Sequence, residues 1–164
     1  MSRTQYVEYA NRGFWAYDVT LGVFLKHLID AAEASDQATT EWLTCAILWW
    51  REVACISDFG LSLDAGWSEA QRQSFLALTE VACSRLAERT SIPGAEILSW
   101  ASLNDLDIFL RGATEVFTAP IVELGRAIIA LVSGTLPEAP KGMAWFYTHT
   151  GRQTLQLESI KRRK

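Results

Sequence analysis

The chain is poor in the residue types that build disulfide frameworks and metal centres. Its 164 residues include three cysteines and two histidines. An odd number of cysteines, each in an apolar stretch, does not indicate a disulfide framework, so we expect Cys45, Cys55 and Cys83 to be small buried side chains. Neither His27 nor His149 has a partner at the spacing of a metal-ligand pair. We therefore expect no metal and no other cofactor.

Long hydrophobic runs are also missing. No window holds the roughly 20 uninterrupted apolar residues that a membrane-spanning helix needs. The best run extends from Trp42 to Trp50 and ends at Arg51 and Glu52. The first eight residues lack the apolar core of a secretory signal. The sequence therefore predicts a cytoplasmic protein that has no membrane partner.

Catalytic motifs are missing as well. The chain contains no Gly-x-x-x-x-Gly-Lys-Ser/Thr and no Gly-x-Ser-x-Gly, so phosphoryl transfer and serine hydrolysis have no support. The tripeptide at 58–60 matches the magnesium-binding Asp-Phe-Gly of kinases, but the other kinase motifs are absent and a turn is the better interpretation. Asp105 and Asp107 would diverge on a helix, which favours solvated charges over a carboxylate pair. The catalytic residues, if the protein is an enzyme, stay unknown.

Charge is unevenly distributed along the chain. The formal net charge is −4. Residues 1–140 carry 9 basic against 18 acidic side chains, a net of −9, and residues 141–164 carry 6 against 1, a net of +5. An acidic body is a poor surface for a phosphate backbone, so we expect no nucleic-acid partner. It suits a basic protein partner, and the basic residues 161–164 are typical of a solubilising tail.

The chain is rich in tryptophan, with seven residues. Apolar side chains form two adjoining stripes along residues 42–56, which include Trp42, Trp49 and Trp50. A helix that is apolar over so much of its circumference is normally surrounded by other helices. We therefore expect this segment to be the central helix of the fold.

Further helices are marked by their ends. Ser68 and Gln71 have the spacing of a capping box and predict a helix to about Arg89. Pro120 and Gly134 are suited to the first turn and the C-terminal stop of another helix. Periodicity predicts one more helix at 18–34 and shorter ones near 95–100 and 103–112. The aromatic residues 14–17 are expected to pack as a lid or strap.

The pattern changes beyond Pro137 and Pro140. Residues 143–148 and 153–157 are typical of two strands joined by a turn at 149–152, with a short helix as the alternative. We therefore predict a mainly α fold. It consists of a single-domain helical bundle around the tryptophan-rich helix in residues 1–140, followed by a C-terminal segment, 141–164, with a short β-hairpin at 143–157 and the basic tail.

Two functions stay open. The first is a cytoplasmic protein-binding module, such as an adaptor, an inhibitor or immunity-like protein, or an assembly factor. Its acidic helical body suits a basic protein partner, and self-association into a homo-oligomer also stays open. The densest aromatic cluster outside the central helix has the composition of an interface anchor. The candidate interface residues are Trp145, Phe146, Tyr147 and Arg152.

The alternative is a small-molecule-binding protein or enzyme with an aromatic pocket between helices, where helical proteins commonly place ligand sites. Its candidate ligand-binding residues are Trp49, Trp50, Arg51, Glu52 and His27.

Overall fold

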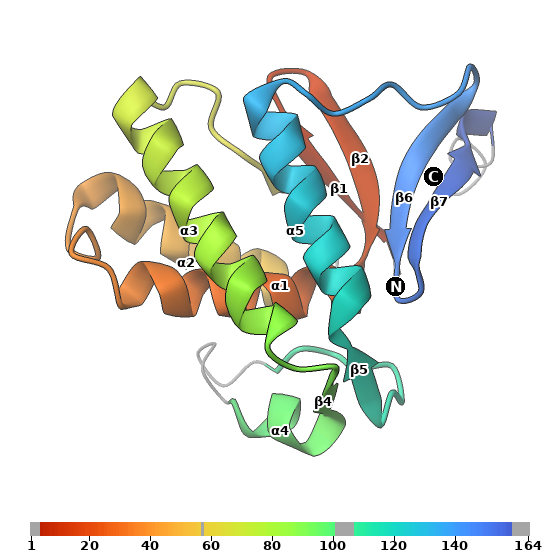
Figure 1. The fold of residues 1–164 in the computed structure, drawn as a ribbon, viewed down its shortest axis with the longest axis horizontal. Coiled ribbons are helices and arrows are strands. Elements are labelled where there is room, and N and C mark those ends of the chain that lie inside the picture. The colour runs from red at the N-terminus through yellow and green to blue at the C-terminus, as the bar shows by residue number, and fades with distance from the viewer. Residues whose placement is uncertain (1–3, 57, 101–106, 159–164) are drawn as a thin grey trace.

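The fold was obtained as a computed structural model, which describes residues 4–56, 58–100 and 107–158. A five-stranded mixed sheet and a two-stranded sheet accompany the helices (Figure 1). The prediction of a mainly α, all-helical bundle is therefore wrong, and the protein has an α/β fold. Asp105 and the basic residues 161–164 lie outside the described part of the chain. The elements in chain order are β1 (Thr4–Tyr9), β2 (Arg12–Tyr17), α1 (Asp18–Glu33), α2 (Glu41–Cys55), β3 (Leu61–Ser62), α3 (Glu69–Ala87), β4 (Ser91–Pro93), α4 (Gly94–Ser99), β5 (Glu115–Phe117), α5 (Thr118–Ser133), β6 (Met143–Thr148) and β7 (Gly151–Gln156).

The larger sheet joins two hairpins that are far apart in the sequence. Its strand order is β3-β1-β2-β6-β7. Strands β1 and β2 are antiparallel, as are β6 and β7, whereas β2 and β6 run parallel, with Trp15 opposite Phe146. The two strands predicted at 143–157 are thus present. They form part of the main sheet, where β6 pairs with β2.

The N-terminal hairpin was missed for two physical reasons. Residues 14–17, expected to be a strap, belong to strand β2. The hairpin turns at Ala10 and Asn11, whose φ angles are 49° and 62°, and such a turn is normally signalled by glycine. The strands also carry aromatic residues on both faces, which hides the alternation of apolar and polar residues that marks a half-buried strand.

The central helix is α1 and not the tryptophan-rich α2. Twelve of the 16 residues of α1 are buried, against five of the 15 residues of α2. Helix α2 packs on α1 through the stripe that contains Leu43, Ile47 and Trp50. Its second stripe is only partly covered, since Cys45 is exposed, Trp42 and Trp49 are half-buried, and Val53 is buried. Both stripes are apolar in the sequence, but only the first is buried along its whole length, so the predicted centre of the fold is wrong.

Several helix ends follow the sequence signals. Ser68 accepts a hydrogen bond from the Gln71 amide and Gln71 accepts one from the Ser68 amide, so the predicted capping box opens α3. Gly134 ends α5 in the left-handed conformation, with φ 76°. The short helix expected at 103–112 is not formed over 107–112, and its first residues lie outside the described range.

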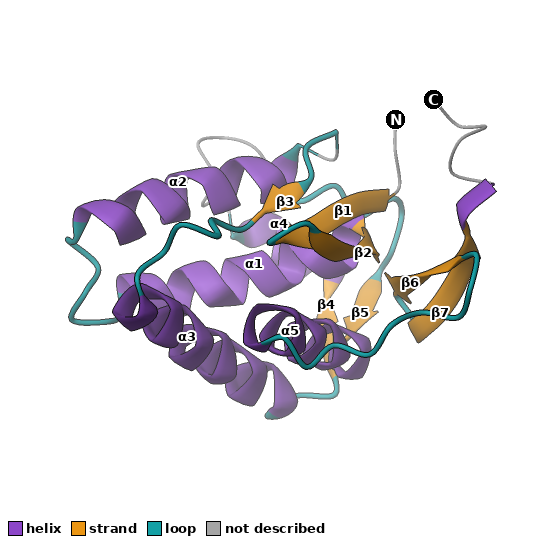
Figure 2. Cartoon of the chain, turned by 90° about the horizontal axis from the view of Figure 1, so that it is seen from above, coloured by secondary structure: helices purple, strands orange, loops and turns teal. Residues whose placement is uncertain are grey.

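Helix α5 lies between α3 and the sheet (Figures 1 and 2). The close approach of α1, α3 and α5 depends on Gly125, because a Cβ atom there would lie 2.4 Å from Sγ of Cys83 and 2.9 Å from Cε2 of Phe24. An interior glycine normally weakens a helix. Here it lets three helices share one tightly packed core.

A buried ion pair fixes the start of α1. Nη2 of Arg111 lies 2.6 Å from Oδ2 of Asp18, and the two side chains are only 12% and 6% exposed. Asp18 also accepts a hydrogen bond from the amide of Val19. Arg111 has φ 52° and is followed by Gly112 with φ 81°. The ion pair therefore holds this left-handed turn of the chain against the first turn of α1.

Candidate functional site

The residues proposed to line a small-molecule pocket have different neighbours. Trp50 is 1% exposed and its ring packs on Phe75 of α3. Arg51 forms an ion pair with an acidic side chain of α1. His27 packs edge-on against Trp100, with ring centroids 5.7 Å apart, and burial lowers its pKa, which leaves it neutral at pH 7. The remaining two, Trp49 and Glu52, lie toward the exposed side of α2.

The four candidate interface residues fall on both faces of the sheet. Alternation along β6 places Trp145 and Tyr147 on one face and Phe146 on the other. Tyr147 is 2% exposed and packs on Phe14, with ring centroids 4.7 Å apart. Burial raises the pKa of Tyr147. Tyr147 therefore belongs to the core in this chain, whereas Phe146 is partly exposed.

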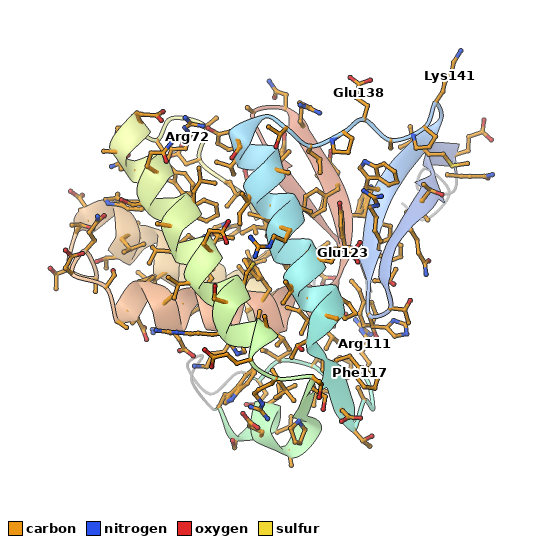
Figure 3. All side chains as sticks on the ribbon, viewed as in Figure 1. Arg72, Arg111, Phe117, Glu123, Glu138 and Lys141 are labelled. Carbon is orange, nitrogen blue, oxygen red and sulfur yellow. The ribbon has the colours of Figure 1, made fainter. Side chains whose placement is uncertain are left out.

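Trp145 and Arg152 form a pair at the rim of the sheet. The guanidinium of Arg152 lies over the Trp145 ring, 4.3 Å from its centroid, and the indole Nε1 donates to the carbonyl of Pro137. The Arg152 amide donates to Glu123 of α5, which lies toward the β6–β7 hairpin (Figure 3). The ring contact and the indole hydrogen bond hold the two side chains against their own protein, and the backbone hydrogen bond joins β7 to α5.

The exposed end of α2 combines apolar and acidic side chains. Leu48 is 54% exposed, and Phe59, which follows the helix, is 39% exposed. Trp49 stacks on Phe59, with ring centroids 5.6 Å apart and planes at 26°. Glu52 lies one turn beyond Leu48, and Asp58 directly precedes Phe59. We call Leu48, Trp49, Glu52, Asp58 and Phe59 the α2 patch.

A buried amide from the sheet positions this patch. Gln5 of β1 is 3% exposed. Its Nε2 lies 3.0, 3.3 and 2.6 Å from three carbonyl oxygens, those of Val53, Ile56 and Phe59. A helix end leaves carbonyl groups without intrahelical partners. Gln5 donates to one of these, that of Val53, and to two carbonyl groups of the chain that follows α2. The chain that leaves α2 is thereby fixed to the sheet, and the rings of the patch keep their places.

The end of α2 has an electrostatic conflict. Its last turn contains no basic residue, yet it carries Glu52, and Asp58 follows closely. The C-terminal end of a helix has a partial negative charge, so carboxylates there are unfavourable and cations favourable. Neither Glu52 nor Asp58 has a salt-bridge partner within residues 4–56, 58–100 and 107–158. The patch is therefore a place where added positive charge is favourable.

A third carboxylate, that of Asp107, lies near the same helix end, close to the Cys55 thiol. Burial, with a smaller contribution from the charge of Asp107, raises the pKa of the Cys55 thiol to about 11.

Burial likewise raises the pKa of Cys83 to about 11. Cys83 is buried as expected and Cys55 is half-buried, but Cys45 lies at an exposed position of α2, where the expectation of a buried side chain is wrong.

A second uncovered surface lies on the sheet. Three aromatic side chains stand side by side across it, because Tyr6 is opposite Trp15 and Trp15 is opposite Phe146. All three are partly exposed, whereas the alternating residues Val7 and Phe14 are buried. Of these three residues, only Phe146 was a candidate interface residue from the sequence. The register of the hairpins, which the sequence did not reveal, brings the others beside it.

Other chemistry finds little support. In the part of the chain that the structure describes, no three His, Cys, Asp or Glu side chains are grouped to hold a metal ion. None of the helices seen there combines the length and the hydrophobicity required to cross a bilayer. Comparison with protein-family models, with curated proteins and with solved structures gave no match. The candidate sites therefore depend on geometry and charge alone.

Proposed function

We propose that the chain is a cytoplasmic protein-binding module, acting as an adaptor, an inhibitor or immunity-like protein, or an assembly factor, and that the α2 patch binds a basic segment of its partner. One observation carries the proposal. The last turn of α2 bears Glu52 and no cation, and Asp58 follows the helix end, although the helix dipole favours the opposite arrangement. Local conflicts of this kind are typical of functional sites.

The composition of the α2 patch supports the proposal. Protein interfaces commonly have an aromatic or aliphatic centre and a polar rim. In the patch Leu48 and the stacked rings of Trp49 and Phe59 supply the centre, and Glu52 and Asp58 supply an acidic rim. Lysine or arginine side chains of a partner would pair with these carboxylates and would also offset the negative end of the helix.

The net charge agrees with such a partner. Residues 1–140 carry twice as many acidic as basic side chains. Opposite net charges accelerate association, and this acceleration weakens as salt screens it. The three thiols, none of which forms a disulfide, fit a reducing compartment such as the cytoplasm. No contact described above favours the alternative, a small-molecule pocket between helices.

The test is capture followed by mutation. The purified chain is used to isolate a stoichiometric partner from extracts of its own cells, and the affinity is then measured for wild type, Glu52→Gln and Asp58→Asn. Both variants should bind about tenfold more weakly, since one charge pair at an interface contributes about 1.5 kcal/mol or more. Glu138→Gln is the matched control, because Glu138 lies between α5 and β6, away from α2 (Figure 3).

A stability measurement separates binding from folding. Glu52→Lys should stabilise the isolated protein by about 0.3–1 kcal/mol, because a cation replaces an anion at the helix end. The same substitution should abolish binding of a basic partner. A partner that binds Glu52→Lys and Asp58→Asn as tightly as wild type would refute the proposal, as would the absence of any stoichiometric partner.

A further inference from the structure

The uncovered face of the larger sheet carries a continuous aromatic row. Tyr6, Trp15 and Phe146 lie at directly opposed positions on β1, β2 and β6, and Gln153 of β7 is opposite Phe146. The rings of Tyr6 and Trp15 are in contact, with centroids 5.1 Å apart. We call the face that contains these four residues the outer sheet face.

The helices lie on the other side of the sheet. The buried residues of β1 and β2 are Gln5, Val7, Phe14 and Ala16, which alternate with the outer row. Gln5 reaches the end of α2, and the contacts of α1 and α5 with the sheet bury the rest of this set. The outer row is partly exposed at Tyr6, Trp15 and Phe146 and exposed at Gln153. Among described elements, no helix therefore buries this face.

A glycine lets the Tyr6 ring lie close against the backbone of β2. A Cβ atom at Gly13 would lie 2.8 Å from Cζ of Tyr6. The Tyr6 ring thus covers the bare backbone of the neighbouring strand while its outer side stays accessible. Burial raises the pKa of Tyr6, with a smaller effect of Glu8, so its hydroxyl is neutral at pH 7 and can donate a hydrogen bond.

Charge distinguishes this face from the rest of the molecule. Of the side chains that the strand alternation places on it within the described strands, Glu8 alone is acidic and none is basic. A chain with a net charge of −4 repels a second copy of itself. The repulsion is smallest where the two copies meet through an uncharged surface. A basic partner, by contrast, gains little from a face with a single carboxylate.

We propose that the outer sheet face binds a second copy of this chain, through a two-fold contact in which two such faces pack together. Sheets packed face to face lie about 10 Å apart and interdigitate their side chains. The Trp15 and Phe146 rings of one copy lie between those of the other. Interfaces between identical subunits are more apolar than other interfaces and are rich in aromatic residues, as this face is.

The size of the face sets the strength of the dimer. Four strands at about 4.8 Å spacing span about 15 Å, and six-residue strands are about 20 Å long. The flat area is thus about 300 Å² per copy, well below the roughly 800 Å² that each partner contributes to a standard interface. The dimer is therefore weak and reversible, with a dissociation constant in roughly the 10 µM to 1 mM range.

Sedimentation equilibrium over about 10 µM to 1 mM protein tests the proposal. The average mass should rise from 18.3 kDa toward twice that value as the concentration increases. Phe146→Glu places two like charges near the two-fold axis and should weaken the dimer at least tenfold. Phe146→Gln, which keeps the face neutral, should have a smaller effect and shows that the fold tolerates a polar residue there. Val81→Glu adds the same charge at an exposed position of α3 and should leave the dimer intact.

The outcome is independent of the proposed function. Leu48→Glu changes the α2 patch and should leave self-association unchanged, whereas Phe146→Glu should leave partner binding unchanged. A mass of 18.3 kDa at every concentration would overturn the dimer, and so would equal effects of Phe146→Glu and Val81→Glu. Suppose instead that the wild-type protein is monomeric and that the Phe146→Glu variant no longer binds the partner. The outer sheet face then binds the partner, and the dimer is refuted.

Discussion

Gly125 gives a direct test of how the helices pack. In an ordinary helix interior, replacing glycine by alanine stabilises the protein by about 0.5–1 kcal/mol, because the unfolded chain loses freedom. In α5 the new Cβ would lie 2.4 Å from Sγ of Cys83 and 2.9 Å from Cε2 of Phe24. Ordinary contacts between such atoms are more than 1 Å longer than the first of these distances. The helices or the side chains must therefore move.

The expected magnitude follows from these two opposing effects. Overpacking of a dense core costs about 1–3 kcal/mol, and the gain in helix propensity offsets about 1 kcal/mol of that cost. The 2.4 Å approach to Sγ of Cys83 places this substitution in the upper part of that range, about 2–3 kcal/mol, so Gly125→Ala should destabilise the protein by about 1–2 kcal/mol. For a chain of this length, the melting temperature should fall by about 2–8 °C. Cys83→Ala removes the sulfur and should restore part of the stability lost in Gly125→Ala. The restoration is only partial because the contact of the new Cβ atom with Phe24 remains.

Urea denaturation followed by circular dichroism measures the four proteins of this double-mutant cycle. We expect a favourable coupling of about 1 kcal/mol between the two substitutions. Gly22→Ala in α1 is the matched control, because its Cβ would meet neighbours at 3.0 and 3.2 Å, where small adjustments suffice. A Gly125→Ala variant as stable as wild type, or additive effects of the two substitutions, would show that α3 and α5 are farther apart than described.

Three more predictions follow from burial. Trp50→Ala should destabilise the protein by about 3–5 kcal/mol, because it removes a buried ring. Trp49→Ala removes a partly exposed ring and should destabilise the protein by less than half as much. Equal urea midpoints for the two variants would contradict this order. A thiol reagent at pH 8 should label the exposed Cys45 first. The labelling rate of Cys55 should rise about tenfold per pH unit up to pH 10, because the pKa of this thiol is about 11 and only the thiolate reacts. Asp18→Asn should destabilise the protein by about 3 kcal/mol because it removes the carboxylate of a largely buried ion pair. A loss below 1 kcal/mol in thermal melts would contradict this prediction.

Local signals in the sequence predicted the helices well. The capping box at Ser68 and the glycine stop at Gly134 depend on hydrogen bonds within a few residues, so they can be recognised without knowledge of the fold. The C-terminal strands were found for the same reason. By contrast, the turn at Ala10 and Asn11 places an alanine at φ 49°, a conformation that this residue type does not announce. The N-terminal strands, and with them the fold class, were therefore missed.

The candidate sites were harder to predict because they depend on what each surface faces. Trp49 and Trp50 are adjacent and chemically identical, yet only Trp50 is buried. Composition cannot decide which stripe of an apolar helix is covered. The acidic end of α2 was visible at Glu52 and Asp58, but its importance depends on where the helix ends and on the absence of a nearby cation among the described residues. From the sequence, Glu52 was a candidate binding residue, whereas Asp58 was interpreted only as part of a turn.

The pairing of β2 with β6 has a consequence for biosynthesis. The ribosome delivers the β1–β2 hairpin first and β6 more than a hundred residues later. At about 5–20 residues per second this interval is on the order of ten seconds. Until then the β2 edge has no neighbour, and an open edge invites pairing with other nascent chains. A two-stranded hairpin is barely stable alone, so a translation pause before residue 143 should make the emerging chain depend on a chaperone.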